Sequence, residues 1–179
     1  MTQDNFLFKT GDFCVYKTHG VGRIKEIQEI KIATYVSNCY VVFFEKEKLT
    51  ISVPVNQVTS GYLRKIGCKE NMEEVFTILK NGTKKIKGMW SRRAKEYEEK
   101  INSGDVLLIA EVLRDLTRDI ADADRSFSER MIYETAIYRL SSEYAIINKI
   151  TLAEAEVKIL EVSKEKINFI DMSKDGTNS

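Results

Sequence analysis

The apolar residues of this chain follow two different periods, and the change from one to the other falls near residue 67. Before that point, short apolar runs alternate with charged residues between glycine or charged turns, which is the pattern of β-strands. After it, apolar residues recur at helical spacing and form a stripe on one face of a segment. The sequence therefore predicts two domains, a β module over residues 1–66 and a helical bundle from residue 67.

The first half carries strand-like segments that are four to seven residues long. They are Phe13–Tyr16, Val21–Ile27, Tyr40–Phe44 and Leu49–Val53. Gly20 and Gly22 fit a turn and a β-bulge at the start of the second segment, and Pro54, the only proline, ends the last. Short strands at such regular intervals indicate a small antiparallel barrel or sandwich. A module of about 60 residues is only marginally stable on its own, so we expect its stability to depend on the rest of the chain.

The second half carries start signals for about five helices. Asn71 is a candidate N-cap for the first helix, and Asp105 is one for the long third helix. Two capping boxes, Ser126–Glu129 and Thr151–Glu154, open the last two helices. The third helix has one apolar stripe, formed by Val106, Ile109, Leu113, Leu116 and Ile120. We expect a two-domain α+β fold with a helical domain over residues 67–170 and a disordered polar tail over residues 171–179.

The charges of the chain almost cancel, with 28 Lys and Arg against 27 Asp and Glu, for a formal net charge of +1. This balance excludes a wholly basic protein that coats nucleic acid, and equally a wholly acidic solvating one. Any electrostatic function must therefore come from charges that are segregated locally. No apolar run approaches the roughly 18 residues of a membrane span. The N-terminus shows no signal-peptide pattern, so we expect a cytoplasmic protein with no membrane partner.

Neither metal binding nor catalysis finds support in the residues. Cys14, Cys39 and Cys68 are far apart and form no Cys-x-x-Cys pair, so we expect buried, reduced thiols with no disulfide framework or zinc site. His19 is the only histidine, and no serine or cysteine lies in a nucleophile motif. The segment His19–Gly22 lacks the third glycine and the Lys-Ser/Thr of a phosphate-binding loop. We expect a protein that is not an enzyme and holds no cofactor.

One segment breaks the charge balance. Between residues 80 and 95 there are seven basic residues and no acidic one, and Trp90, the only tryptophan, lies among them. The basic residues are Lys80, Lys84, Lys85, Lys87, Arg92, Arg93 and Lys95. In one interpretation the lysines form a solvated loop and Trp90 is a core residue. In the other, Trp90 faces solvent among cations and contacts nucleic acid, because cations neutralise phosphates while an aromatic ring stacks on or wedges between bases.

Several motifs in both halves resemble the CarD/CdnL family of bacterial transcription regulators. In the helical half they are Trp90–Arg93, Ser103–Asp105, Ala110–Leu116 and Ser128–Arg130. In the β half, which that family shares with the transcription-repair coupling factor, they are Phe8–Asp12, Val15–Tyr16, His19–Gly20 and Leu49–Pro54. The resemblance covers roughly residues 6 to 162, and the order and spacing of the motifs across both halves make it specific.

The resemblance implies a Tudor-like (SH3-like) β module that docks on the β subunit of RNA polymerase, and a helical domain that contacts promoter DNA. It implies that Trp90 acts as a wedge in the minor groove at the upstream edge of the melted bubble. Basic residues near Trp90 would hold the flanking phosphates, namely Arg92, Arg93, Lys95, Lys84, Lys85 and Lys87. The candidate polymerase contacts are Arg23, Lys25, Ile51, Ser52 and Val53. This chain departs from the family at Ser52, where a basic residue is frequent, and at Ala94, where an aromatic one is.

The sequence thus predicts a non-enzymatic transcription regulator that binds RNA polymerase and stabilises the open promoter complex. We expect a monomer that associates with the nucleoid through the polymerase. Two alternatives remain open from the residues. One is a nucleic-acid-binding module that acts without polymerase, and the other is a protein–protein adaptor whose two domains bind different proteins.

Overall fold

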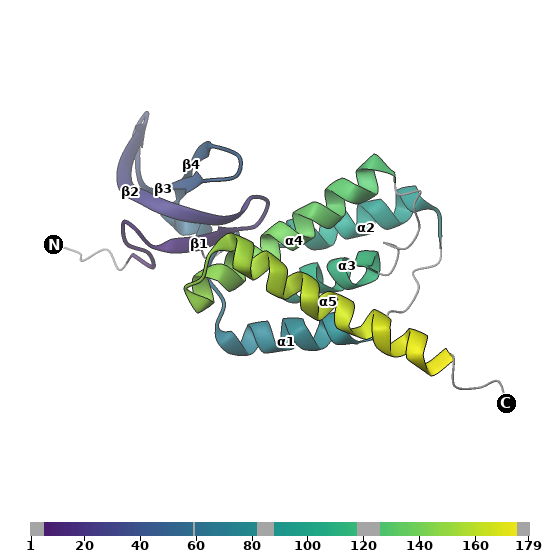
Figure 1. Cartoon of the computed structure of the whole chain (residues 1–179). Helices are drawn as coiled ribbons and strands as arrows, with labels where there is room; N and C mark the ends of the chain where they lie inside the picture. Colours follow the sequence, from purple (N-terminus) through teal and green to yellow (C-terminus); the bar gives the residue numbers. More distant parts are fainter. Residues whose placement is uncertain (1–5, 59, 82–87, 118–125, 175–179) are drawn as a thin grey trace. The chain divides into compact units, whose positions relative to one another are not determined.

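A computed structural model of the chain describes residues 6–58, 60–81, 88–117 and 126–174, with five strands and five helices among them (Figure 1). The chain divides into two compact units, Met1–Ile66 and Gly67–Ser179. The first contains the strands and the second contains the helices, and each has its own cluster of buried apolar side chains. The two-domain α+β fold expected from the sequence is confirmed.

The β unit is one antiparallel sheet with the strand order β4-β3-β2-β1-β5. Its elements are β1 (Phe13–Tyr16), β2 (Gly20–Ile32), β3 (Tyr35–Phe44), β4 (Leu49–Pro54), a 3-10 helix (Val55–Val58) and β5 (Leu63–Lys65). The strands β4 and β5 are therefore the two edges of the sheet. Each pairs with a neighbour on one side only, so main-chain hydrogen-bonding groups of an edge strand remain available on the other.

Tyr40 lies at the centre of the β core with none of its surface exposed. Its hydroxyl accepts hydrogen bonds from the backbone N–H of Leu7, at 3.0 Å, and of Phe8, at 3.4 Å. The Phe8 ring packs edge-on against it, with 5.4 Å between the ring centroids. A buried tyrosine needs a partner for its hydroxyl, and here that partner is the segment before β1, which is thereby held against the sheet.

Gly20 and Gly22 have different structural roles. Gly20 has a φ of +80°, which is the turn position that the sequence predicts. The predicted bulge at Gly22 is wrong, because the irregularity in β2 lies between Ile24 and Glu26. Gly22 is instead a point of close approach: a Cβ there would lie 2.6 Å from Val42 Cγ1 and 2.8 Å from a ring carbon of Phe44.

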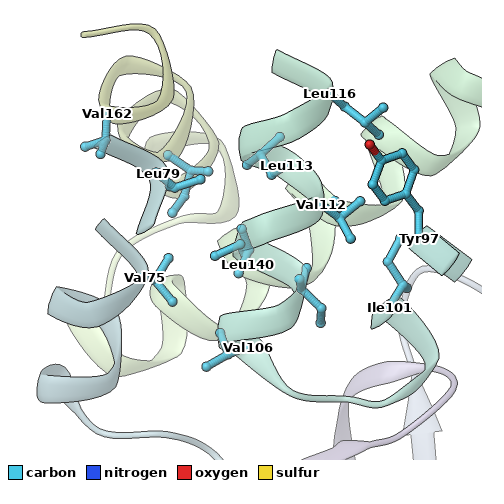
Figure 2. Close-up of a cluster of buried hydrophobic side chains, with 14 of the residues drawn as sticks. Val75, Leu79, Tyr97, Ile101, Val106, Val112, Leu113, Leu116, Leu140 and Val162 are labelled. Carbon is cyan, nitrogen blue, oxygen red and sulfur yellow. The ribbon is translucent and has the colours of Figure 1, made fainter. Parts of the chain in front are cut away.

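The helical unit is built around α3, whose residues are buried at eight of 12 positions. Its helices are α1 (Lys69–Lys80), α2 (Trp90–Asn102), α3 (Val106–Thr117), α4 (Phe127–Asn148) and α5 (Leu152–Lys174). All four other helices contact α3. Figure 2 shows Val112, Leu113 and Leu116 of α3 among side chains of the surrounding helices. The predicted stripe on this helix is confirmed as far as Leu116, and Ile120 lies outside the described residues.

Most helix starts agree with the sequence. Asp105 accepts a hydrogen bond from the backbone N–H of Leu107 at 2.9 Å, and both bonds of the capping box at Thr151 form. At Ser126 the hydroxyl accepts from the Glu129 N–H at 3.3 Å, as expected of an N-cap. The predicted N-cap at Asn71 is wrong, because α1 begins at Lys69 after Cys68. Asn71 is the third residue of the helix, and its side-chain oxygen accepts from the Cys68 N–H at 3.0 Å. A short polar side chain can serve a helix start from this position as well as from the N-cap.

The other corrections concern the tail and one thiol. Residues 171–174 belong to α5, and no glycine or proline occurs between the start of this helix and Gly176. Residues 175–179 lie outside the described residues. Cys14 and Cys39 are buried as expected, and burial raises the pKa of the Cys14 thiol to about 12. Cys68 is exposed, contrary to expectation, because it lies at the start of α1 rather than in a strand. No described helix is long and apolar enough to cross a membrane.

We predict that Gly22→Ala lowers the free energy of unfolding by about 1–3 kcal/mol, because the new methyl group must displace packed atoms of Val42 and Phe44. Urea denaturation followed by circular dichroism measures this. The matched control is Ser52→Ala on the exposed side of β4, which should change stability by less than about 0.5 kcal/mol. A stabilised Gly22→Ala variant would mean that the strand yields easily and that the loss of glycine flexibility in the unfolded chain dominates.

Candidate functional sites

Trp90 is the first residue of α2 and is partly buried. Its ring packs against the core of the helical unit, 6.4 Å from the Tyr97 ring between centroids. The indole Nε1–H donates a hydrogen bond of 2.9 Å to the hydroxyl of Ser128, at the start of α4. Trp90 thus lies between the two interpretations of the sequence, a solvent-facing ring and a core residue. Trp90 lies at the edge of the core, with part of its surface in solvent.

The sequence contained a signal for this position. Trp90, Ala94, Tyr97 and Ile101 recur at helical spacing and form one stripe along α2. Tyr97 and Ile101 belong to the helical core, and Trp90 and Ala94 pack against it. Tyr97 and Ile101 are buried, whereas Ala94 and Trp90 are partly exposed. Burial thus decreases toward the N-terminus of α2. The aromatic ring stands where the helix leaves the core.

The basic residues in the first two turns of α2 differ in their exposure. The guanidinium carbon of Arg93 lies 5.4 Å from the centre of the Trp90 ring, a cation–π geometry, and this side chain is partly buried. Arg92 and Lys95 are both exposed. Because they are three residues apart on one helix, they are neighbours on its outer surface. The first turn of α2 contains no acidic residue, and the N-terminus of a helix itself favours anions.

The remaining cations of this segment do not join a described site. Lys80 ends α1 and pairs with Glu165 of α5, with 3.2 Å between nitrogen and oxygen. Lys84, Lys85 and Lys87, expected to hold phosphates, lie outside the described residues. The described cations of this segment near Trp90 therefore all belong to α2.

An apolar surface that the sequence analysis missed lies beside Trp90. Phe127 and Met89 are each 77% exposed, and Met131 is 46% exposed. A groove of about 410 Å³ between α2 and α4 is lined by Phe127, Ser128 and Met131 among others. The capping box at Ser126 could have indicated this, because it makes Phe127 the first residue of α4, where no preceding turn covers it.

On the β unit, Arg23, Lys25 and Ser52 are exposed as the sequence predicts. Arg23 is aligned with Phe43 in the β2–β3 pair, and Phe43 is aligned with Thr50 on the edge strand β4. The Lys25 ammonium lies 5.0 Å from the centre of the Phe43 ring. This face of the sheet therefore offers cations and an aromatic ring next to an open edge.

Ile51 and Val53 do not belong to that face. Val53 is only 1% exposed, and Ile51 packs against the same β core. Side chains alternate along a strand, so in β4 the ones before and after Ser52 point to the opposite face. The expectation that a partner contacts these side chains is wrong for Val53, which is buried, and Ile51 offers only a partly exposed side chain. The main chain of β4 remains an edge of the sheet.

His19 contacts side chains of the β unit, including Tyr16 and Glu47. Its ring stacks on Tyr16, with centroids 5.7 Å apart, and Nδ1 lies 2.5 Å from a carboxylate oxygen of Glu47. The contact joins the turn before β2 to the turn before β4. No group of three or more potential metal ligands occurs among the described side chains.

Two family models match this chain. Residues 8–67 match the CarD-like/TRCF RID domain, and residues 74–160 match the C-terminal domain of CarD. A relative from Bacillus subtilis (strain 168), named "Putative transcription factor YdeB", is 28% identical over 152 residues, which make up 85% of this chain and 98% of that protein. Both units of the fold are thus covered, and the β unit is similar to the Tudor-like module that the sequence analysis expects.

We predict that Trp90→Ala lowers the free energy of unfolding by about 1–3 kcal/mol. The loss should exceed the roughly 0.5 kcal/mol of an ordinary surface change, because the ring packs on Tyr97 and the core. It should be smaller than the loss of about 3–5 kcal/mol that is typical when a fully buried aromatic side chain is replaced by alanine. Chemical denaturation of the variant measures it. Trp90→Phe is the control that keeps most of the packing and should lose less stability. Equal losses of stability in both variants would contradict a contribution from packing of the ring.

Proposed function

The chain belongs to the CarD/CdnL family of bacterial transcription regulators, and we propose that it docks on the β subunit of RNA polymerase and stabilises the open promoter complex. In this proposal residues 1–66 form the polymerase-interacting domain and residues 67–170 form the DNA-contacting domain. Trp90 wedges into the minor groove at the upstream edge of the bubble. The observation that carries the proposal is the position of Trp90: a partly exposed ring at the edge of a folded core, next to exposed cations.

A single stacked ring supplies enough free energy to alter the lifetime of an open base step. Opening a base step costs a few kcal/mol, and an aromatic ring stacked on a base returns about 1–3 kcal/mol. A change of about 1.4 kcal/mol alters an equilibrium tenfold. One well-placed ring therefore changes the lifetime of the bubble without any need for strong overall binding to DNA.

Partial burial suits a wedge better than full exposure would. A freely rotating side chain must be ordered when it inserts, and that ordering reduces the gain from binding. The inner side of the Trp90 ring already packs on Tyr97 and the core. Packing thus restricts the movement of the exposed part, and Arg92 and Lys95 are placed nearby to neutralise phosphates.

The β unit offers a way to attach the protein to the polymerase. The edge strand β4 can add to the sheet of a partner through main-chain hydrogen bonds. Ser52, Arg23 and Lys25 supply polar and charged groups on the exposed surface. Attachment raises the effective concentration of the helical domain at the promoter. A net charge of +1 is compatible with this arrangement, because DNA affinity alone does not have to recruit the protein.

We predict that Trp90→Ala shortens the lifetime of open promoter complexes by up to roughly tenfold, the change that corresponds to about 1.4 kcal/mol. Trp90→Phe should lie between the variant and the wild type, because a smaller ring still stacks. The dissociation rate of purified polymerase–promoter complexes measures this, at a temperature where thermal melts show each variant to be folded. An unchanged lifetime would remove Trp90 from DNA contact and favour an adaptor.

We predict that polymerase binding belongs to the β unit. Residues 1–66, which have a buried apolar cluster of their own, should capture the purified β subunit once circular dichroism shows the fragment to be folded, and residues 67–179 should not. Full-length Trp90→Ala is the matched control and should be captured as well as the wild type. Capture by residues 67–179 alone would contradict the assignment, and no capture by the full chain would favour a nucleic-acid-binding module that acts without polymerase.

A further inference from the structure

We infer that Ser128 is a positioning residue that sets the orientation of the Trp90 ring and, through it, the strength of the DNA wedge. The inference rests on the proposed function for its link to DNA. Its structural part is independent of that function. The observation behind it is the hydrogen bond of 2.9 Å between Trp90 Nε1 and Ser128 Oγ, which joins residues 38 positions apart in the chain.

The bond uses the single polar atom of the indole. An indole can donate one hydrogen bond and accept none, so the direction of Nε1–H defines how the ring is turned. Packing on Tyr97 restricts the ring on its inner side, and the cation of Arg93 lies near its face. Neither contact is directional enough to select one orientation in the ring plane. The Ser128 hydroxyl supplies that selection.

Ser128 is itself held in place. Its hydroxyl lies 3.1 Å from the hydroxyl of Ser126, the N-cap of α4, which accepts from the Glu129 N–H at 3.3 Å. Because Ser128 accepts from the indole, its own hydrogen is free to be donated to Ser126. The ring is thereby connected through two hydroxyls to the start of a 22-residue helix. A shift of that helix start would turn the ring, and α4 is anchored in the core by Ile132 and Ala136.

The energetic consequence follows from preorganisation. A ring fixed before insertion loses less freedom on binding than a ring that samples several orientations. Loss of one hydrogen bond of this kind corresponds to a roughly two- to tenfold effect on an equilibrium. Ser128 should therefore influence open-complex lifetime without touching DNA, and its effect should require the Trp90 ring.

Trp90 is the only tryptophan, so the full-length protein has a single indole N–H signal in nitrogen-15 NMR spectra. In Ser128→Ala this signal should move, and its hydrogen should exchange with water at least about twofold faster. Ser128→Thr keeps the hydroxyl and should restore both properties. Ser91→Ala, an exposed serine beside Trp90, is the matched control and should leave the signal in place. An unchanged signal and exchange rate in Ser128→Ala would overturn the inference.

The DNA part is tested by a double-mutant cycle on open-complex lifetime, with Ser128→Ala, Trp90→Ala and the two combined. We expect Ser128→Ala alone to shorten the lifetime roughly two- to tenfold. In the Trp90→Ala background it should add nothing. An equal further loss in that background would show that Ser128 acts independently of the ring, which overturns the inference. If Trp90→Ala itself had no effect, the proposed function would fail, whereas the indole signal would still decide whether Ser128 orients Trp90.

Discussion

Burial of α3 is the constraint on which the helical unit depends. Eight of its 12 residues are buried, and α1, α2, α4 and α5 all contact it. Removing a large aliphatic side chain from water contributes about 1.5–3 kcal/mol, so the orientation of the surrounding helices is set by how they cover this one. On α2, the residues that turn toward the core include Tyr97 and Ile101. Helical periodicity then places Trp90 on the same stripe, at the point where the core ends.

The same geometry gives Trp90 its two properties. Contact with the core restricts the ring, and its position at the helix start leaves part of it exposed. Arg92 and Lys95 are on the outer surface of the same helix because the helical period turns them away from the stripe. Stability and the proposed DNA contact therefore both depend on this one side chain. A single substitution at Trp90 should affect both, which is why the proposed experiments separate folding from promoter kinetics.

Much of the fold could be predicted from the sequence because local rules dominate where the pattern is strong. The N-cap at Ser126 and the capping box at Thr151 depend on residues three apart and formed as expected. Gly20 has the positive φ of a turn, which glycine tolerates without strain. Some errors are local, such as the N-cap at Asn71, and others concern neighbours that are distant in sequence. Gly22 looks like a bulge by itself, and only the approach of Val42 and Phe44 from other parts of the sheet explains it.

The candidate site divides along the same line. The sequence shows that a lone tryptophan lies in a basic segment, and its periodicity predicts that Arg92 and Lys95 are neighbours on a helix and that strands precede helices. These follow from composition and from periods of two and 3.6 residues. The folded structure was needed to show that Val53 faces inward, that Trp90 is partly buried, and that its Nε1–H reaches Ser128. Each depends on packing between segments far apart in the chain, and the partner atom of a hydrogen bond across two helices has no local sequence signature.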